Sequence, residues 1–202
     1  MTGPAQPAAS IHPGAVRAIF DHLILALATD PGAGPSFLYS HYSIRWARDG
    51  VVGELAYIQL DRDGRRERLV VTDEPRSASS AAGRFSPAAW DPADARRAPI
   101  IARFERSGLG GPTVRETVTA DGLSLTAEWS DLAAPLFAQG PAPRVPSEDI
   151  TSTLLEARSA RATLDGRPVA GEPYPNDGWV AWLGRPLSSC VVAIGEVLLT
   201  RP

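Results

Sequence analysis

Two hydrophobic periods divide this chain. Between residues 12 and 29, apolar residues recur at spacings of three and four, which is the period of a helix with one apolar face. Asp30-Pro31-Gly32 then provides a stop signal for such a helix. From Phe37 the period changes to two, as in strands whose side chains alternate between two faces. The pattern predicts an N-terminal amphipathic helix over residues 13–30 and a β-domain over residues 37–202.

The apolar face of the predicted helix needs a partner. Either the helix packs on the outside of the sheet, or it plugs one mouth of a barrel as a lid. Residues 1–12, which are rich in Pro, Ala and Gly, predict a disordered tail.

Five Asp-Gly pairs punctuate the chain. Asp-Gly suits the two central positions of a type I′ hairpin turn, because both residues there need positive φ. Four pairs separate runs rich in β-branched and aromatic residues and so predict hairpins: Asp49-Gly50, Asp63-Gly64, Asp121-Gly122 and Asp165-Gly166. The fifth pair, Asp177-Gly178, lies in a loop over residues 173–184 that we expect to rim the barrel.

Successive hairpins favour an all-β fold, a single up-and-down antiparallel β-barrel of eight or nine strands, over the alternative of two packed sheets. A barrel of eight strands is either filled by side chains or holds one small ligand. Residues 74–98 form a long connection of the kind that often serves as a lid. The density of Pro between residues 131 and 149 excludes a central strand there. The predicted strands are Phe37–Arg48, Val51–Leu60, Arg66–Thr72, Pro99–Ser107, Thr113–Ala120, Leu123–Ser130, Asp149–Leu164, Arg167–Gly171 and Leu187–Thr200.

Composition excludes several classes of chemistry. All 20 basic residues are Arg, so neither a Schiff-base lysine nor a P-loop lysine is available. A lone Cys190 excludes an internal disulfide and a Cys-based zinc site. Metal-ligand spacing and a Gly-rich nucleotide loop are both absent from the sequence, so we expect no metal and no cofactor.

Charge and hydropathy narrow the expected partners. The net charge of −3 gives no general attraction for nucleic acid or anionic membranes. There is no apolar run of 18 residues, and the N-terminus lacks the basic region of a secretory signal. We therefore expect a cytoplasmic protein that binds neither nucleic acid nor membranes. Because a barrel of this size can hold one small ligand, the expected partner is a hydrophobic small molecule. Its oligomeric state stays open, a homodimer being one form.

Four side chains in the predicted strands are candidates for catalysis. Tyr39, His41 and Tyr57 could donate a hydrogen bond to a carbonyl inside a cavity. Glu196 stands in an apolar row of the last strand, where a carboxylate needs either a raised pKa or a partner such as Arg45. The plainer alternatives are a hydrogen-bonded strand histidine and a salt-bridged structural glutamate.

Four tryptophans are candidates for substrate contact: Trp46, Trp129, Trp179 and Trp182. Trp179 and Trp182 lie in a Gly- and Pro-bearing loop, where aromatic side chains at a barrel mouth can grip an apolar ligand. Ordinary packing is the alternative for the tryptophans, and strand alternation places Trp129 in the core.

The second half of the chain resembles a known class of barrels. Trp129-Ser130-Asp131 at a strand end, a Pro-rich loop, a long strand, then Asp165-Gly166-Arg167-Pro168 and Gly171 resemble lipocalin-type (calycin) β-barrels of bacterial secondary metabolism. This group includes carotenoid-hydratase-like proteins and the spirotetronate and spirotetramate polyketide cyclases of actinobacteria. The resemblance implies an N-terminal segment that closes the mouth, and it assigns no catalytic residue.

The resemblance also implies a modest chemistry. Such cyclases fold a flexible polyene in a dry cavity and supply orientation and a hydrogen bond. The first hypothesis is therefore a cofactor-independent cyclase or isomerase, of Diels–Alder type, acting on an apolar polyketide-like molecule inside the barrel. The second is a lipocalin-like carrier without turnover, and the third is a structural domain whose barrel is packed solid.

Overall fold

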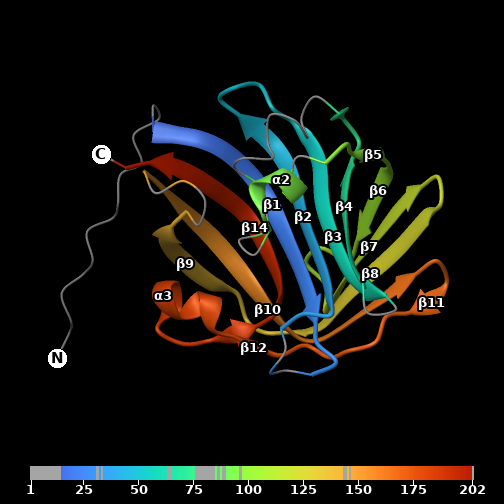
Figure 1. The fold of residues 1–202 in the computed structure, drawn as a ribbon. Helices are drawn as coiled ribbons and strands as arrows, with labels where there is room; N and C mark the ends of the chain where they lie inside the picture. The colour runs from blue at the N-terminus through green and yellow to red at the C-terminus, as the bar shows by residue number, and fades with distance from the viewer. Residues whose placement is uncertain are drawn as a thin grey trace.

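The structure is a computed structural model. It describes residues 15–30, 32, 34–62, 65–75, 85, 87, 90–95, 97–142, 145 and 147–201. A single large sheet curls into a nearly closed barrel, with short helical segments against its outside (Figure 1). The predicted disordered tail lies outside the described residues.

The described elements are mostly strands. Their bounds are β1 Val16–Leu27, β2 Phe37–Ala47, β3 Gly53–Arg62, β4 Arg65–Thr72, β5 Ile100–Ile101, β6 Arg103–Ser107, β7 Thr113–Ala120, β8 Leu123–Leu132, β9 Leu136–Pro141, β10 Glu148–Leu164, β11 Arg167–Pro168, β12 Pro175–Asn176, β13 Leu187–Ser188 and β14 Cys190–Thr200. The helical segments are α2 Pro92–Ala95, the 3₁₀ turn η2 Asp177–Trp179, and α3 Val180–Leu183.

Two meanders and one long strand build the barrel. The order of paired strands is β5-β4-β3-β2-β1-β14-β10-β8-β7-β6, with β9 and β11 as further partners of β10. The 17-residue β10 joins the two halves, because its first half pairs with β14 and β9 and its second half with β8. As the proline density predicts, β9 is not a central strand, since among the described strands it pairs only with β10.

Consecutive strands link the two ends of the sheet. The short β5 runs parallel to β4, and β6 follows after one residue and pairs with β7. Ala102, between them, donates its N–H to the carbonyl of Thr72 at 2.9 Å. The segment from Ile100 to Ser107 thus bridges both ends, which makes the sheet nearly closed.

The predicted N-terminal helix over residues 13–30 is wrong. Residues 16–27 form β1, which pairs with β2 on one side and β14 on the other. Both faces of β1 are covered, with Leu23 and Leu25 inside the barrel and Ala26 outside. A strand apolar on both faces does not alternate, and register shifts near Val16 and Phe20 disturb the period further. Apolar spacings of three and four therefore arise without a helix.

The predicted strand count of eight or nine is too low. The described residues form a 12-stranded sheet and a separate two-stranded sheet. The difference comes from β1, from the break at Ala102 within one predicted strand, and from short edge pairings such as β9 and β12. Strands of two residues, such as β5 and β12, are too short for an alternation to be read from the sequence.

Three of the predicted Asp-Gly hairpins are present, at Asp49-Gly50, Asp121-Gly122 and Asp165-Gly166. Only the last has the backbone of the predicted type I′ turn. Asp165 (φ 50°) and Gly166 (φ 76°) both have positive φ, between β10 and β11. At residues 49–50 and 121–122 the glycine alone is positive. Asp63-Gly64 lies outside the described residues, and Asp177-Gly178 forms η2 beside the pocket described below.

The sheet buries both of its faces over β1–β4. The inner face carries one apolar core that includes Leu23, Tyr39 and Trp129. The outer face of β1–β4 carries a second core, which Phe85 and Trp90 cover from the long connection after β4. A third core lies where α3 and its neighbours cover the outer side of β9, β10 and β14. In the described part of the chain, no helix is both long and apolar enough to span a membrane.

We predict that Leu23→Ala lowers the free energy of unfolding by about 2–5 kcal/mol, because Leu23 is fully buried in the inner core. The matched control is Leu109→Ala, at a residue that is 47% exposed, with an expected change within about 0.5 kcal/mol. Urea unfolding monitored by circular dichroism measures both values. Equal small effects would contradict the assignment of residues 16–27 to a central strand.

Candidate functional site

Two histidines mark two sites on opposite faces of the sheet. His41 points into the barrel, where charged side chains surround it. His22 points outward, into a pocket. Two of the predicted catalytic residues, Tyr39 and His41, belong to the inner group.

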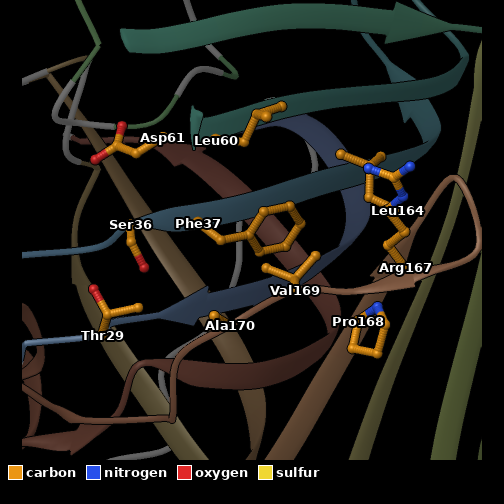
Figure 2. Close-up of a pocket in the computed structure, with 10 residues that line it drawn as sticks. All are labelled: Thr29, Ser36, Phe37, Leu60, Asp61, Leu164, Arg167, Pro168, Val169 and Ala170. Atoms are coloured by element: carbon orange, nitrogen blue, oxygen red, sulfur yellow. The ribbon is translucent and has the colours of Figure 1, made fainter. Parts of the chain in front are cut away.

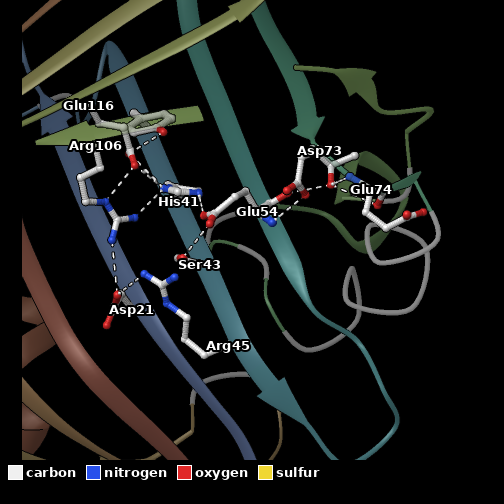
Figure 3. A network of polar contacts seen from close by, with 11 residues as sticks. Asp21, His41, Ser43, Arg45, Glu54, Asp73, Glu74, Arg106 and Glu116 are labelled. Carbon is white, nitrogen blue, oxygen red and sulfur yellow. Dashed lines mark hydrogen bonds and ion pairs between the residues drawn. The ribbon is translucent and has the colours of Figure 1, made fainter. Parts of the chain in front are cut away.

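His41 lies between two carboxylates inside the barrel (Figure 3). Its Nδ1 is 2.9 Å from Glu116, and its Nε2 is 2.8 Å from Glu54 Oε2. Tyr39 donates its hydroxyl to Glu116 at 2.7 Å, and Arg106 donates to the same carboxylate at 3.1 Å. Phe104 stacks on the His41 ring at 4.7 Å. We call this group, with its further members, the inner network: Asp21, Tyr39, His41, Ser43, Arg45, Glu54, Arg106 and Glu116.

The opposite charges of the inner network stabilise one another in their ionised forms. Burial by itself lowers the pKa of His41, but Glu116 and Glu54 more than offset it, so that this pKa lies above its usual 6.5. Burial by itself raises the pKa of Glu116, but His41 and Arg106 bring it down to about 2. With His41 protonated, the three acids of the network face three cations. The network therefore joins β1, β2, β3, β6 and β7 by charge.

The central members of the inner network, His41 and Glu116, are buried inside the barrel. The side chains of His41 and Glu116 are 0% and 1% exposed. Burial beside Glu116 raises the pKa of Tyr39 well above 10, so the phenol stays protonated and donates to that carboxylate. This arrangement fits the structural alternative for His41, a hydrogen-bonded strand histidine.

A small cavity of about 240 Å³ lies at one mouth of the barrel (Figure 2). Phe37, Leu60 and Leu164 line its apolar side, and Asp61 and Arg167 stand at its edge. Its volume falls below the range of about 300–1,000 Å³ that is typical of ligand pockets. The inner core fills the barrel beyond Phe37 with large apolar side chains.

A larger cavity, of about 420 Å³, lies on the outer face of the sheet. We call it the outer pocket. Its floor is the outward side of β1, β2, β10 and β14, including His22, Ser40 and Glu196. Its walls come from the two covers of the sheet, with Phe85 on one side and Trp179 on the other. A mostly apolar pocket of this size with a few converging polar groups is typical of a small-molecule site.

Three neighbouring strands bring the polar groups of the floor together. Ser40 Oγ on β2 lies 2.9 Å from His22 Nε2 on β1. His22 Nδ1 lies 3.6 Å from Glu196 Oε2 on β14, a close electrostatic contact longer than a hydrogen bond. Tyr42 stacks on the His22 ring at 4.0 Å. The three groups form a line of hydroxyl, imidazole and carboxylate.

Trp179 and Trp182 form one wall of the outer pocket, which we call the tryptophan wall, and its position depends on a glycine. Trp179 and Trp182 meet edge to face at 5.7 Å between ring centroids. Trp182 lies directly against Gly140 of β9, where an added Cβ would come within 2.5 Å of the indole Cδ1. Gly140 thus lets the indole approach the strand.

The structure divides the predicted site residues among several places. Glu196, Trp179 and Trp182 line the outer pocket, and Tyr39 and His41 belong to the inner network. Tyr57 is buried in the outer core under Trp90, at 5.2 Å between rings.

Two predicted tryptophans lie apart from the outer pocket. Trp129 is buried in the inner core and donates its indole N–H to the carbonyl of Ile24 at 2.8 Å. Trp46 is 44% exposed near one end of β2. The suggested partner of Glu196, Arg45, pairs with Asp21 instead, at 3.2 Å.

Sequence reasoning missed His22 and Ser40. The predicted helix hides His22, because a helical segment has no neighbours across a sheet. The signal in the sequence is Glu196, since a carboxylate in an apolar strand row needs a partner, and the pairing of β1 with β14 brings His22 to it.

Comparisons and metal sites add little to this picture. No protein-family model, no curated protein and no solved structure matches this chain. Among the residues described, no group of three or more His, Cys, Asp or Glu side chains is placed to hold a metal ion.

The inner network makes stability depend on pH with a defined sign. The raised pKa of His41 means that its contribution is fully present below pH 6.5, its usual value, and is lost as the pH rises through the raised value. We predict that the free energy of unfolding of the wild type falls across this range and that His41→Gln flattens the fall. Urea unfolding between pH 5.5 and 9 measures both curves. Parallel curves for the two proteins would contradict the prediction.

We predict that Glu116→Gln lowers the free energy of unfolding at pH 7 by roughly 3–5 kcal/mol, because it breaks a buried charge network from one side. The matched control is Asp61→Asn, which breaks an exposed pair with Arg66 and has an expected cost of about 0–1 kcal/mol. Urea unfolding of the three proteins at pH 7 decides the comparison. Similar costs for the two variants would show that the network does not act as a buried unit.

Proposed function

We propose that this protein binds an apolar small molecule in the outer pocket. The observation that carries the proposal is a cavity of about 420 Å³ whose walls are aromatic and aliphatic and whose floor holds His22, Ser40 and Glu196. None of the described residues that line this cavity is Arg. Together these features favour a neutral ligand with an extended apolar surface over a carboxylate or phosphate compound.

The reaction that we propose is a cofactor-independent cyclisation or isomerisation. The pocket would hold a flexible chain in a reactive conformation, and the polar floor would donate a hydrogen bond to a carbonyl of the ligand. The ligand site then lies outside the barrel rather than within it. Three more specific parts of this proposal rest on the sequence. They are a Diels–Alder-type reaction of a polyketide-like chain, a relationship to lipocalin-like barrels, and a cytoplasmic location.

A carrier without turnover is the second candidate. Tyr39 and His41, two of the predicted hydrogen-bond donors, belong to the inner network and both contact Glu116. Because these contacts occupy two of the groups expected to act on a ligand, they favour a carrier. Incubation with a linear polyene precursor separates the two candidates. A product of unchanged mass with fewer double bonds supports the cyclase, whereas binding without conversion supports the carrier.

The tryptophan wall gives a direct test of the pocket. We predict that Trp179→Ala weakens the binding of an apolar probe such as retinol by about tenfold, equivalent to roughly 1.4 kcal/mol, because Trp179 lines the outer pocket. The matched control is Trp46→Ala, at an exposed site away from the pocket, with affinity expected to stay within about twofold of the wild type.

Energy transfer from tryptophan to retinol, titrated for the three proteins, measures these affinities. Equal weakening by both substitutions, or tight binding that neither affects, would place the ligand elsewhere. No binding by any probe of an apolar panel would favour the third reading of the sequence, a structural domain.

A further inference from the structure

The floor of the outer pocket has the order of groups that activates a serine. Ser40 pairs across the sheet with Ile24 of β1, His22 with Ala193 of β14, and Glu196 with Phe20 of β1. The three side chains therefore descend diagonally over β2, β1 and β14 on one outer face. Because adjacent strands in a ladder are rigidly spaced, the line is fixed by backbone pairing rather than by a mobile loop.

The carboxylate selects the tautomer of His22. Glu196 is buried, and its Oε2 has no hydrogen-bond partner within the described structure; His22 Nδ1 faces it at 3.6 Å. A bare Nδ1 lone pair facing a carboxylate would be repelled, so the proton of a neutral imidazole belongs on Nδ1. Nε2 is then an acceptor, and Ser40 donates its hydroxyl to it over 2.9 Å. This is the protonation state in which a histidine acts as base toward a serine.

We propose that Ser40 is the nucleophile of an acyl-transfer site that takes neutral esters of apolar acyl chains. The inference rests on the outer pocket being a small-molecule site, and it adds a covalent reaction to it. Phe85, Trp179 and Trp182 would surround the acyl chain, while the ester carbonyl would lie on the floor beside Ser40. His22 acts as general base, and Glu196 is a positioning residue that acts through His22.

The steps balance with water as the second reactant. Ser40 Oγ attacks the ester carbonyl while His22 Nε2 takes the hydroxyl proton, and the alcohol leaves with that proton as the C–O bond breaks. Water then attacks the acyl group on Ser40 and gives a proton to His22, which returns it to Oγ as the carboxylic acid leaves. A hydroxyl on the acyl chain itself could take the place of water, and the product would then be a lactone.

Asn176 is the group that we assign to the developing oxyanion. It lines the outer pocket, and its Oδ1 accepts the backbone N–H of Gly178 at 2.9 Å. This contact orients the side chain and leaves the amide NH₂ as the donating end. A side-chain amide of this kind can stabilise the charge of a tetrahedral intermediate.

The wild-type protein tests the proposal directly. We expect an alkyl fluorophosphonate, a neutral probe that transfers phosphorus to an activated serine with loss of fluoride, to add once to the protein, and peptide mapping by mass spectrometry to place the adduct on Ser40. The full chain should also hydrolyse p-nitrophenyl esters, faster for octanoate than for acetate, because the longer chain fills the apolar walls. His22→Gln should slow labelling by about 10²–10⁴-fold.

The matched control is Ser43→Ala. Ser43 lies on the same strand and is as buried as Ser40, but it belongs to the inner network, where it donates to Glu54. Its substitution should leave the labelling rate within about twofold of the wild type, whereas Ser40→Ala should abolish the adduct. Circular dichroism and urea unfolding show which variants fold.

Glu196 is tested by a signal that a merely structural role would not change. The ¹⁵N shifts of the His22 ring should report the proton on Nδ1 in the wild type and a shift toward the other tautomer in Glu196→Gln, with labelling slowed by at least roughly tenfold. Glu196→Asp, which keeps the charge, should restore part of the labelling rate.

The outcomes separate this inference from the proposed function. If the wild type binds retinol but takes no adduct, or takes it at another residue, the acyl-transfer site is overturned while the binding pocket stands. If an adduct forms on Ser40 at the same rate in His22→Gln, activation by His22 is overturned. If retinol does not bind and Ser40 is labelled, the proposed apolar ligand is wrong and the reactive serine remains.

Discussion

The pairing of β1 with both β2 and β14 is the contact on which the rest of the structure depends. It joins the first described strand to the last one, and so it brings the two meanders into one curled sheet. It also makes β1 a central strand whose two faces are both buried. Burial of apolar surface on both sides of one strand is a strong stabilising term, because each covered face removes its side chains from water. The same pairing sets Ser40, His22 and Glu196 side by side.

The outer pocket is a consequence of how the outer face is covered. One cover, which carries Phe85 and Trp90, packs over β1–β4, and the other, around α3, packs over β9, β10 and β14. The pocket floor runs along β1 and its neighbours, between these covers. A strand ladder offers precise side-chain positions but engages its own backbone N–H groups. In the proposed acyl transfer, a side chain such as that of Asn176 in the wall would supply the oxyanion donor.

Two histidines on opposite faces of one sheet, His41 buried and His22 partly exposed, show how neighbours decide the role of a side chain. His41 has a carboxylate against each ring nitrogen, and its charge is fixed within a balanced network. His22 has a serine on one side and a carboxylate on the other, and its ring borders a cavity. The first arrangement holds charge inside the barrel, and the second is the one to which we assign proton transfer in the proposed reaction.

The sequence by itself determined the strands with clear alternation, the hairpins at Asp49-Gly50, Asp121-Gly122 and Asp165-Gly166, the lack of a central strand in the proline-rich stretch that holds β9, and the unusual position of Glu196. These features follow from local chemistry, since turn residues, proline and the period of two act within a few positions. Only the tertiary structure decided that residues 16–27 are a strand, because a segment buried on both faces loses its alternation. It also decided the site, since His22, Ser40 and Glu196 are up to 174 residues apart and become neighbours through the pairing of β2, β1 and β14, a long-range contact that no local pattern encodes.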